Sequence, residues 1–388
     1  MSDAPESLES RVGKRLRAIR DGQLLRTLRP PAGFDFSSND YLGLAGDPRL
    51  KRAMIDAVEQ LGCGSTGSRL LRGEREAFSA VERKFAAFKH TDRSLYFSSG
   101  YLANLGVLTT LPESGDVIFS DERNHASLID GARLSAASRV VFAHNDVEEL
   151  SRLLHGRPRD GHAFVVTESL FSMDGDVPPL ADYAAVCRST GATLIVDEAH
   201  AVGVYGAGGG GLIEACGIEP GLCVSINTAG KALGVSGAFV AGPEWAIDYL
   251  IQRARPFIFS TAPPPSLAAA LDTSLDIAIN EPERRAQLAD RVSYVRGALS
   301  SSGVPVPPGF TQIIPIVLGD NDRALVAASE LQAKGFDVRA IRPPSVAPGT
   351  ARLRIAVNLS LSEETIDRFV SALSATLRET VPCSAASS

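Results

Sequence analysis

Seven short apolar runs, separated by amphipathic stretches, occupy the first two thirds of the chain. Continuous apolar runs of this length, bounded by turn residues, predict strands that are buried on both faces. They cover residues 94–100, 116–121, 139–146, 163–169, 192–200, 223–228 and 237–243. Three of the run ends, at Thr167, Val196 and Asn227, recur at about the 30-residue interval of a strand–helix–strand unit. The pattern therefore predicts an α/β fold with a mostly parallel, seven-stranded sheet.

The pattern changes after about residue 260. Long helical stretches are expected over residues 266–300, and the first 40 residues predict a basic helix and a short strand. Further elements are a strand at 311–318, a helix at 321–334, and strands near 336–341 and 352–358. We therefore predict an N-terminal segment at 1–40, a large domain at 41–262 and a smaller α+β domain at 263–388.

Composition and charge narrow the classes of protein. The chain has 388 residues, 44% of them hydrophobic, which is enough for one large or two moderate cores. Its formal net charge of −6 argues against nucleic acid as a partner. Neither a run of membrane-spanning length nor the apolar core of a secretory signal is present, so we expect a cytoplasmic protein without a membrane partner. The cysteines form no CxxC pair, which predicts free thiols and no metal site, and they are Cys63, Cys187, Cys216, Cys223 and Cys383.

Polar residues follow three of the predicted strands. They come in pairs, which are Glu168 with Ser172, Asp197 with His200, and Thr228 with Lys231. Open parallel sheets bind ligands at the carboxyl ends of their strands. These residues are therefore predicted to share one site.

The stretch VDEAH at 196–200 has a competing interpretation, because RNA helicases use the same letters to hold magnesium against ATP. That interpretation requires an upstream phosphate loop of the form GxxxxGK[ST]. The Gly-Lys pairs, Gly13-Lys14 and Gly230-Lys231, lack its other residues, so the helicase interpretation is rejected. A buried strand with a solvated end remains the alternative on these five letters alone.

Lys231 lies in SINTAGKALG (225–234), where no other charged residue occurs between Val224 and Gly234. Desolvation among small residues favours the neutral amine, which attacks aldehydes. Pyridoxal phosphate (PLP) needs such a lysine, a carboxylate for its pyridine nitrogen and donors for its phosphate. Asp197 supplies the carboxylate, and the donors are predicted at the helix N-terminus of Gly100 and Tyr101, with the Thr228 hydroxyl. The sequence thus predicts PLP as cofactor.

Ten motifs in order along the chain resemble the α-oxoamine synthases. They are FSSNDYLGL (36–44), GSTGSRLLRG (64–73), FSSGYLAN (97–104), NHASLIDG (124–131), FAHNDV (142–147), TESLFSMDGD (167–176), VDEAHAVGV (196–204), TAGKALGVSGA (228–238), FSTAPPP (259–265) and IRPPSVAPGTARLR (341–354). The resemblance implies the aspartate aminotransferase-like fold type I of PLP enzymes. It also implies a homodimer with the site at the subunit interface, where FSTAPPP would reach the neighbour's phosphate pocket.

The resemblance also implies roles for individual residues. The catalytic residues it implies are Lys231 for the Schiff base, Asp197 for the pyridine nitrogen, His125 stacked on the ring, and His200, which with Ser172 bonds the phenolic oxygen. Gly100, Tyr101 and Thr228 match the contacts to the phosphate and ring side. The residues that match the substrate site are Arg26, Asn39, His125, Ser345 and Arg354, with Arg354 as the carboxylate partner, for which its planar fork is suited.

Two features of the predicted site stay open. Glu168 either orients Asn39 or the stacked histidine, or pairs in a salt bridge at the strand end. Ala201-Val202 and Ala229 replace residues common in relatives and are expected to reshape the pocket without removing a required group. Other residues are predicted to have no part in the site. The histidines predicted to be structural are His90, His144, His155 and His162. The glycines at 208–211 are predicted to form a turn rather than a phosphate cradle.

The function implied by the resemblance is that of an acyltransferase. The motifs are most similar to the branch that condenses L-alanine with a pimeloyl thioester, carried by coenzyme A or an acyl carrier protein, and releases CO2 and thiol in biotin biosynthesis. Another α-oxoamine synthase, such as the glycine-acetylating one, or an aminotransferase is the alternative enzyme. A catalytically silent protein is disfavoured because Lys231, Asp197, His125 and His200 are all present.

Overall fold

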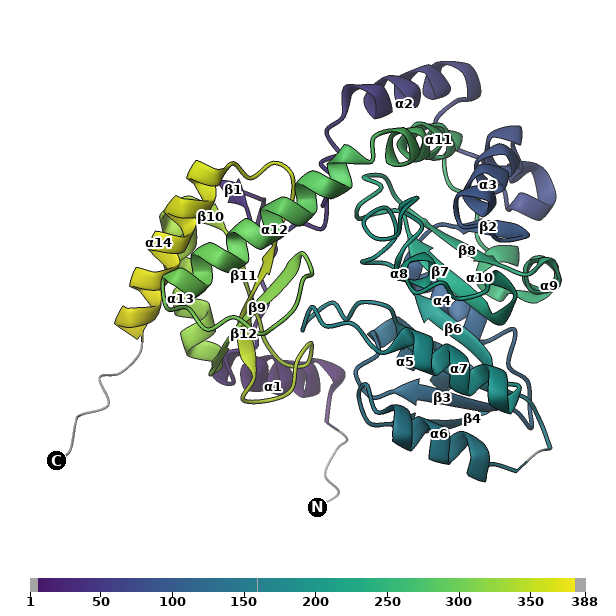
Figure 1. Cartoon of the computed structure of the whole chain (residues 1–388), viewed down its shortest axis with the longest axis horizontal. Coiled ribbons are helices and arrows are strands. Elements are labelled where there is room, and N and C mark those ends of the chain that lie inside the picture. The colour runs from purple at the N-terminus through teal and green to yellow at the C-terminus, as the bar shows by residue number, and fades with distance from the viewer. Residues whose placement is uncertain (1–5, 159, 381–388) are drawn as a thin grey trace. The chain divides into compact units, whose positions relative to one another are not determined.

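The computed structural model describes residues 6–158 and 160–380, which form two compact units (Figure 1). The large unit comprises residues Asn39–Ala289, and the small unit combines the described residues up to Ser38 with those from Asp290 to 380. The predicted boundaries after residues 40 and 262 differ from this division. The boundary predicted after residue 262 differs because the helix that follows it packs on the large unit.

That helix, α11 (Pro265–Asn280), belongs to the large unit because its apolar face is buried there. Ala268, Leu271 and Leu275 are fully buried in a cluster with α3 (Glu76–Phe88), and α11 also packs along α2 (Pro48–Leu61). The chain passes into the small unit only within the next helix, α12 (Glu283–Ser301). A change in sequence pattern therefore marks a change of secondary structure here, and not the unit boundary.

A seven-stranded sheet forms the centre of the large unit, in the order β2-β8-β7-β6-β5-β3-β4. Its strands are β2 (Arg93–Phe97), β3 (Val117–Asp121), β4 (Ser138–Phe142), β5 (Ala163–Glu168), β6 (Thr193–Asp197), β7 (Cys223–Thr228) and β8 (Ala238–Gly242). Only β8 runs antiparallel to its neighbours β2 and β7. The prediction of a mostly parallel, seven-stranded sheet is confirmed.

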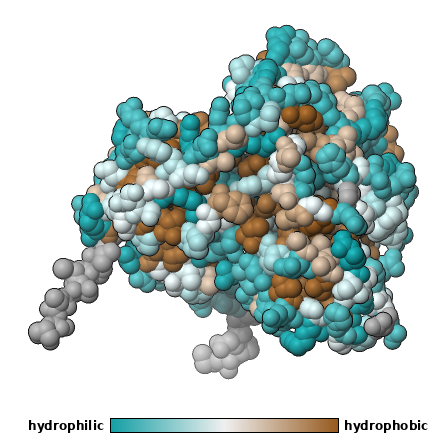
Figure 2. Space-filling view, viewed as in Figure 1, coloured by the Kyte–Doolittle hydropathy of each residue, from teal (hydrophilic) through white to brown (hydrophobic). Residues whose placement is uncertain are grey.

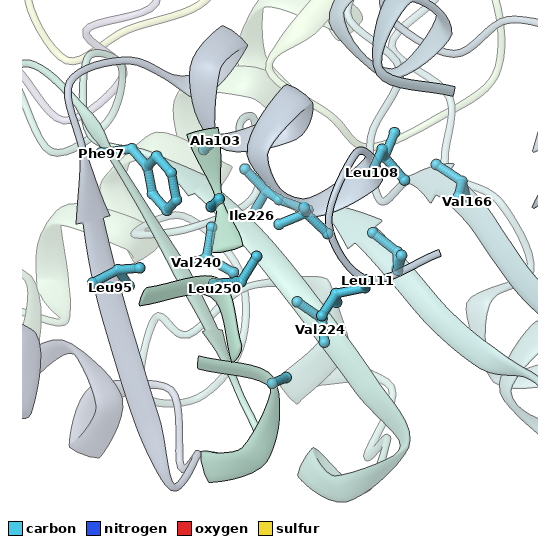
Figure 3. Packing of buried hydrophobic residues seen from close by; sticks show 14 of the residues in the cluster. Leu95, Phe97, Ala103, Leu108, Leu111, Val166, Val224, Ile226, Val240 and Leu250 are labelled. Carbon is cyan, nitrogen blue, oxygen red and sulfur yellow. The ribbon is translucent and has the colours of Figure 1, made fainter. Parts of the chain in front are cut away.

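Helices cover both faces of this sheet. The remaining helices of the large unit are α4 (Gly100–Leu108), α5 (Ala126–Leu134), α6 (Val147–Gly156), α7 (Leu180–Thr190), α8 (Leu212–Ala215), α9 (Glu244–Arg253) and α10 (Arg255–Ile258), with short turns at η1 (Arg69–Gly73) and η2 (Pro220–Leu222). A hydrophobic core lies on each face of the sheet, and successive residues of β2 point into different cores. Leu95 and Phe97 pack with α4 and α9 on one face (Figure 3), whereas Tyr96 packs with α3 and α11 on the other. Burial on both faces explains why six of these strands appear in the sequence as continuous apolar runs. The burial predicted for the run at 139–146 is wrong, because Arg139 and Val141 of the edge strand β4 are exposed.

The small unit contains two further sheets. In one, β12 (Ala351–Ala356) lies between β11 (Arg339–Ile341) and β9 (Ile313–Gly319) in antiparallel pairing. In the other, β1 (Phe34–Asp35) pairs in parallel with β10 (Phe336–Asp337), and the helices are α1 (Leu8–Asp21), α13 (Asn321–Ala333) and α14 (Glu363–Thr380). The single strand predicted near 336–341 is therefore wrong, since the chain changes from one sheet to the other at the buried Val338.

Aromatic packing fixes the N-terminal segment on the small unit. Phe36 stacks on Phe369 of α14 with ring centroids 3.8 Å apart, and Phe336 of β10 contacts both rings edge-on. The backbone of Phe36 also accepts a hydrogen bond from Ala356 at the end of β12. The N-terminal segment is thus part of the small unit's core.

The surface mixes hydrophilic residues with small hydrophobic patches on the face shown in Figure 2. Within the described ranges, every helix is too short or too polar to cross a membrane. Cys63, Cys187, Cys216 and Cys223 are free thiols, as predicted, while Cys383 lies outside the described residues, with the rest of the chain after 380.

Candidate active site

The carboxyl ends of β5, β6 and β7 bring the predicted site residues of the large unit to one edge of the sheet. Glu168 is paired in register with Asp197, Asp197 with Ile226, and Thr228 ends β7. The turn that carries Lys231 follows directly and is closed by hydrogen bonds, including one from Gly234 N to the Lys231 carbonyl (2.9 Å). Gly234 has a φ of +69°, and an added Cβ would lie 2.5 Å from the Ala45 nitrogen, so only glycine fits there.

Lys231 heads a chain of hydrogen bonds that are buried or partly buried. Its Nζ lies 2.7 Å from Nε2 of His200, and the other ring nitrogen of His200, Nδ1, lies 2.6 Å from the Tyr41 hydroxyl. That hydroxyl donates to Oδ1 of Asn39 at 3.0 Å. The His200 ring is therefore held between the Lys231 amine and the Tyr41 hydroxyl. Tyr41 is fully buried.

A second chain links Asp197 to His125 through residues that the sequence analysis did not single out. The side-chain amide of Asn104 donates to Asp197 Oδ2 (2.7 Å) and to Ser127 Oγ (2.8 Å). Ser127 Oγ lies 2.7 Å from Nδ1 of His125, and the other Asp197 oxygen accepts from Ala199 N at 2.9 Å. Because Asn104 donates to Ser127, the serine proton is directed to Nδ1, which leaves the His125 proton on Nε2. Both linking residues occur in motifs quoted above, but their partners lie far away in the sequence.

Burial controls the protonation of the groups beside Asp197. Desolvation raises the pKa of Glu168 well above its usual range, and the charge of Asp197 raises it further. Burial also lowers the pKa of His125, and the opposing charge of Asp197 does not reverse this shift. His125 is therefore a neutral ring at neutral pH. Glu168 Oε1 accepts the backbone N–H of His125 (2.7 Å), which favours its orienting role over a salt bridge.

The N-terminus of α4 forms an anion cradle beside Thr228. Ser99 caps the helix by accepting from Leu102 N at 3.2 Å. A Cβ at Gly100 would lie only 2.4 Å from Thr228 Oγ1, so glycine lets the strand end and the helix end approach. Free backbone N–H groups and the helix dipole favour a phosphate here. The side chain of Tyr101 is exposed and bonds Asp130, so its backbone is the part placed at the cradle.

Ser172 lies in the turn between β5 and α7, which is held by hydrogen bonds between Phe171 and both Gly175 and Asp176. His144 supports this turn. Its Nε2 lies 2.6 Å from Asp176 Oδ2, and its Nδ1 lies 2.9 Å from Asp121 Oδ1. Burial alone would lower the pKa of His144, but the two carboxylates raise it to about 9. The structural role predicted for His144 is consistent with this position.

The predicted substrate residues are divided between the two units. Asn39 lies in the large unit, on the hydrogen-bond chain of Lys231. In the small unit, Arg26 Nη2 lies 3.5 Å from Ser345 Oγ, and Arg354 is buried on β12. The binding roles of all four residues stay predictions.

The neighbouring glycine-rich turn binds side chains of the protein itself. Glu214 accepts from Gly208 N (2.7 Å) and Gly210 N (2.6 Å), and a Cβ at Gly211 would collide with Glu198 at 2.6 Å. Glu198 is completely buried and pairs with the buried Lys89. The turn is therefore packed around two carboxylates, which agrees with the prediction that it is not a phosphate cradle.

These residues fit PLP on structural grounds. The Gly100 cradle suits a phosphate, Asp197 is an anchored carboxylate, and the Lys231 amine lies 2.7 Å from a ring nitrogen of His200. His125, which is linked to Asp197 through Ser127 and Asn104, adds a flat ring. The residues present thus supply each of the groups that this cofactor requires.

Comparison with known proteins supports this interpretation. Residues 31–373 match the family model for aminotransferase class I and II. The 8-amino-7-oxononanoate synthase of Anaeromyxobacter dehalogenans is 44% identical over 96% of both chains, and that of Chromohalobacter salexigens is 46% identical over 91% of this chain and 92% of that one. A structure of SPT with PLP internal aldimine matches with a TM-score of 0.90 and 29% identity, over 97% of this chain and 99% of that chain. The predicted fold type I is confirmed.

Proposed function

Because the chain belongs to the aminotransferase class I and II family, among relatives named 8-amino-7-oxononanoate synthase, we propose that it is the acyltransferase that condenses L-alanine with a pimeloyl thioester. The products are 8-amino-7-oxononanoate, CO2 and a free thiol, which assigns the reaction to biotin biosynthesis. Its cofactor is PLP, as the family and the similar SPT structure establish, so the predicted cofactor is confirmed. The observation that carries the proposal is the convergence of Lys231, His200 and Asp197 at one sheet edge.

When bound, PLP supplies an electron sink for the carbanion formed at the Cα of the amino acid. Lys231 would hold the cofactor aldehyde, the Gly100 cradle and Thr228 would hold its phosphate, and Ser172 and His200 would bond its phenolic oxygen. Asp197 would keep a proton on the pyridine nitrogen. Asn104 and Ala199 N bind both oxygens of this carboxylate, so the charge stays fixed in place.

Lys231 is also the proposed base that removes the Cα proton of L-alanine and later returns a proton. A lysine can accept a proton only when its amine is neutral, and His200 Nε2, 2.7 Å from Nζ, positions that amine. Tyr41 and Asn39 fix the ring of His200 from behind. His125 excludes water from one face of the site as a neutral ring. The substrate carboxylate is assigned to Arg354, with Arg26, Asn39 and Ser345 completing the substrate site.

We further propose a cytoplasmic homodimer. Among the described residues, α1 buries none of its side chains and exposes Leu8, Val12, Leu16 and Ile19 along one face. Such an apolar face is typical of a helix that packs against another chain. Light scattering on the purified protein tests this proposal, and a monomer at micromolar concentration would contradict it.

A substrate screen tests the proposed reaction. The purified protein with PLP should release CO2 and thiol with L-alanine plus pimeloyl thioester, and much less with glycine plus acetyl thioester. One methyl in an apolar pocket contributes only about 1–3 kcal/mol, so alanine should be preferred over glycine without excluding it. Each buried methylene of the acyl chain adds roughly 0.8 kcal/mol, so chain length should discriminate more strongly.

The glycine-acetylating reaction is the alternative outcome. If glycine and acetyl thioester rank first, the acyl specificity proposed here is wrong while the roles of Lys231 and Asp197 stand. A preparation of Lys231→Ala, assayed in parallel, provides the blank for thiol release that does not depend on the site.

A further inference from the structure

A groove of about 680 Å³ lies within the small unit, between the segment after α1 and the face of α13 and β11. The groove is distinct from the sheet edge described above, because all of its lining residues belong to 25–29 and 325–342. Its volume is within the range of small-molecule sites, about 300–1,000 Å³. Arg26 is the only predicted site residue that lines it.

Four arginines line this groove, and they are Arg26, Arg29, Arg339 and Arg342. Asp337 neutralises Arg339 through two hydrogen bonds of 2.6 and 3.0 Å. Among the residues that the structure describes, the other three have no carboxylate partner, and no acidic side chain lines the groove. Their bonds are to neutral groups, since Arg29 contacts Gln332, Arg26 contacts Ser345, and Arg342 donates to the carbonyls of Gln23 and Leu25.

The like charges are close enough to interact. Burial, and then the charge of Arg26, lowers the pKa of Arg342. Gathering cations without counter-charges costs free energy in the free protein, and an anion bound between them would remove that cost. The guanidinium fork matches phosphate oxygens in geometry.

The groove is also lined by apolar side chains. Leu25 and Val326 are about half exposed, at 44% and 47%, and Leu28 is fully exposed at 102%. A simple inorganic anion makes no use of these side chains. A ligand that carries a phosphate and a partly apolar chain would contact both the arginines and the leucines.

We propose that this groove binds the phosphate of a phosphopantetheine thioester, the group that carries the acyl chain of the second substrate. The proposal rests on the proposed function for the choice of thioester. Coenzyme A and acyl carrier proteins both contain this phosphate, so either source presents the same chemistry. Arg29 and Arg342 bind the phosphate, and Leu25 and Leu28 pack against the pantetheine chain.

The experiment compares thioesters with and without phosphate on the PLP-loaded enzyme. Pimeloyl-coenzyme A, the pimeloyl carrier protein and the phosphate-free pimeloyl-pantetheine are each assayed with L-alanine. For each carrier, the kcat/KM is divided by the kcat/KM of pimeloyl-pantetheine, and this ratio is compared between the parent and the variants. In Arg29→Gln and Arg342→Gln, this ratio should fall about tenfold, as expected when one charge-assisted contact is lost. A fall for both carriers supports contact with the shared phosphate, whereas a fall for coenzyme A alone would overturn the proposal in favour of the nucleotide phosphates.

Arg139→Gln is the matched control, because it removes one exposed arginine from β4 of the large unit, outside the groove. A ratio that stays within twofold of the parent in both groove variants, or that falls equally in Arg139→Gln, would overturn the proposal. Calorimetry with coenzyme A and with pantetheine measures binding without turnover. If no thioester is a substrate but coenzyme A still binds more weakly to the groove variants, the proposed function fails while the phosphate site stands.

Discussion

Two lysines of the large unit contact the stretch VDEAH, and their partners differ in chemical type. Lys89 pairs with the carboxylate of Glu198, and both side chains are almost fully buried, at 3% and 0% exposure. Lys231 instead contacts the imidazole of His200, with 2.7 Å between the nitrogens. Lys89 is thus bound to a buried carboxylate, whereas Lys231 contacts an imidazole at the strand ends that carry the predicted site. The comparison teaches that one motif can anchor one lysine in the fold and contact another at the predicted site.

Adjacent acids in the same motif show the same division. Asp197 is bonded by Asn104 and Ala199 N, and is the proposed partner of the pyridine nitrogen. Glu198, the residue just after β6, bonds Lys89 and Ile213 N. These different partners assign one acid to the predicted site and the other to the fold.

Replacing the reactive lysine should give the largest effect. Lys231→Ala should fold normally but lose the covalent cofactor link that borohydride traps, and turnover should fall by roughly 10⁴-fold, because the proposed base is lost as well. Mass spectrometry after borohydride reduction and steady-state kinetics measure the two losses. A covalent adduct that persists in Lys231→Ala would falsify the assignment, and Lys51→Ala on the exposed face of α2 is the control.

Removing the structural lysine should affect stability instead. Lys89→Met leaves Glu198 buried without its partner, which costs about 3–5 kcal/mol of unfolding free energy. The double variant Lys89→Met/Glu198→Gln should recover most of this loss, because no buried charge remains. Urea denaturation measures both values, and a single variant as stable as the parent would remove the contrast between the two lysines.

Replacing the carboxylate of Asp197 should lower turnover strongly and change thermal stability little. Asp197→Asn keeps the shape of the side chain but removes its charge, so turnover should fall by about 10²–10³-fold while the midpoint of thermal unfolding changes by only a few degrees. Steady-state kinetics and calorimetry provide the two readouts. Turnover within a few-fold of the parent would show that Asp197 is not the ring partner.

Removing the Tyr41 hydroxyl, which contacts His200, should have a smaller effect on turnover. Tyr41→Phe removes the partner of His200 Nδ1 and of Asn39, so the unfolding free energy should fall by about 1–3 kcal/mol and turnover by roughly three- to tenfold. Tyr183→Phe is a matched control, because the Tyr183 hydroxyl is buried without a hydrogen-bond partner among the described residues. Equal losses in the two variants would argue that Tyr41 acts through packing alone.

The smallest effect concerns pH and the turn that carries Ser172. The pKa of His144, about 9, lies above its ordinary value of 6.5, so the charged ring contributes its full stabilisation below about pH 6.5. This contribution is lost as the pH rises through 9, and we expect a decrease on the order of 1 kcal/mol relative to His144→Gln. Denaturation of both proteins at pH 6, 8 and 10 measures it, and parallel pH profiles would contradict the role of the charge.

The sequence predicted the elements of the large sheet and most of its site because both depend on local patterns. Apolar runs gave all seven strands, and polar residues at their ends gave Asp197, Thr228 and Lys231. The unit boundary was misplaced, because α11 has the composition of a helix on either unit and only its packing on α2 and α3 assigns it. The strand predicted at 336–341 divided for a related reason, since each half pairs with a different partner.

The sequence by itself determined which chemical groups this protein has and at which strand ends they occur. Only the tertiary structure decided which groups act together. Tyr41 and His200 are separated by 159 positions and Asn104 and Asp197 by 93, yet they meet at 2.6 and 2.7 Å. Local patterns fix the secondary structure of a segment, whereas the partner of a buried polar group is fixed by which distant segment packs against it. The arginines of the small unit form a groove for the same reason, because residues 26 and 342 become neighbours only after the chain folds.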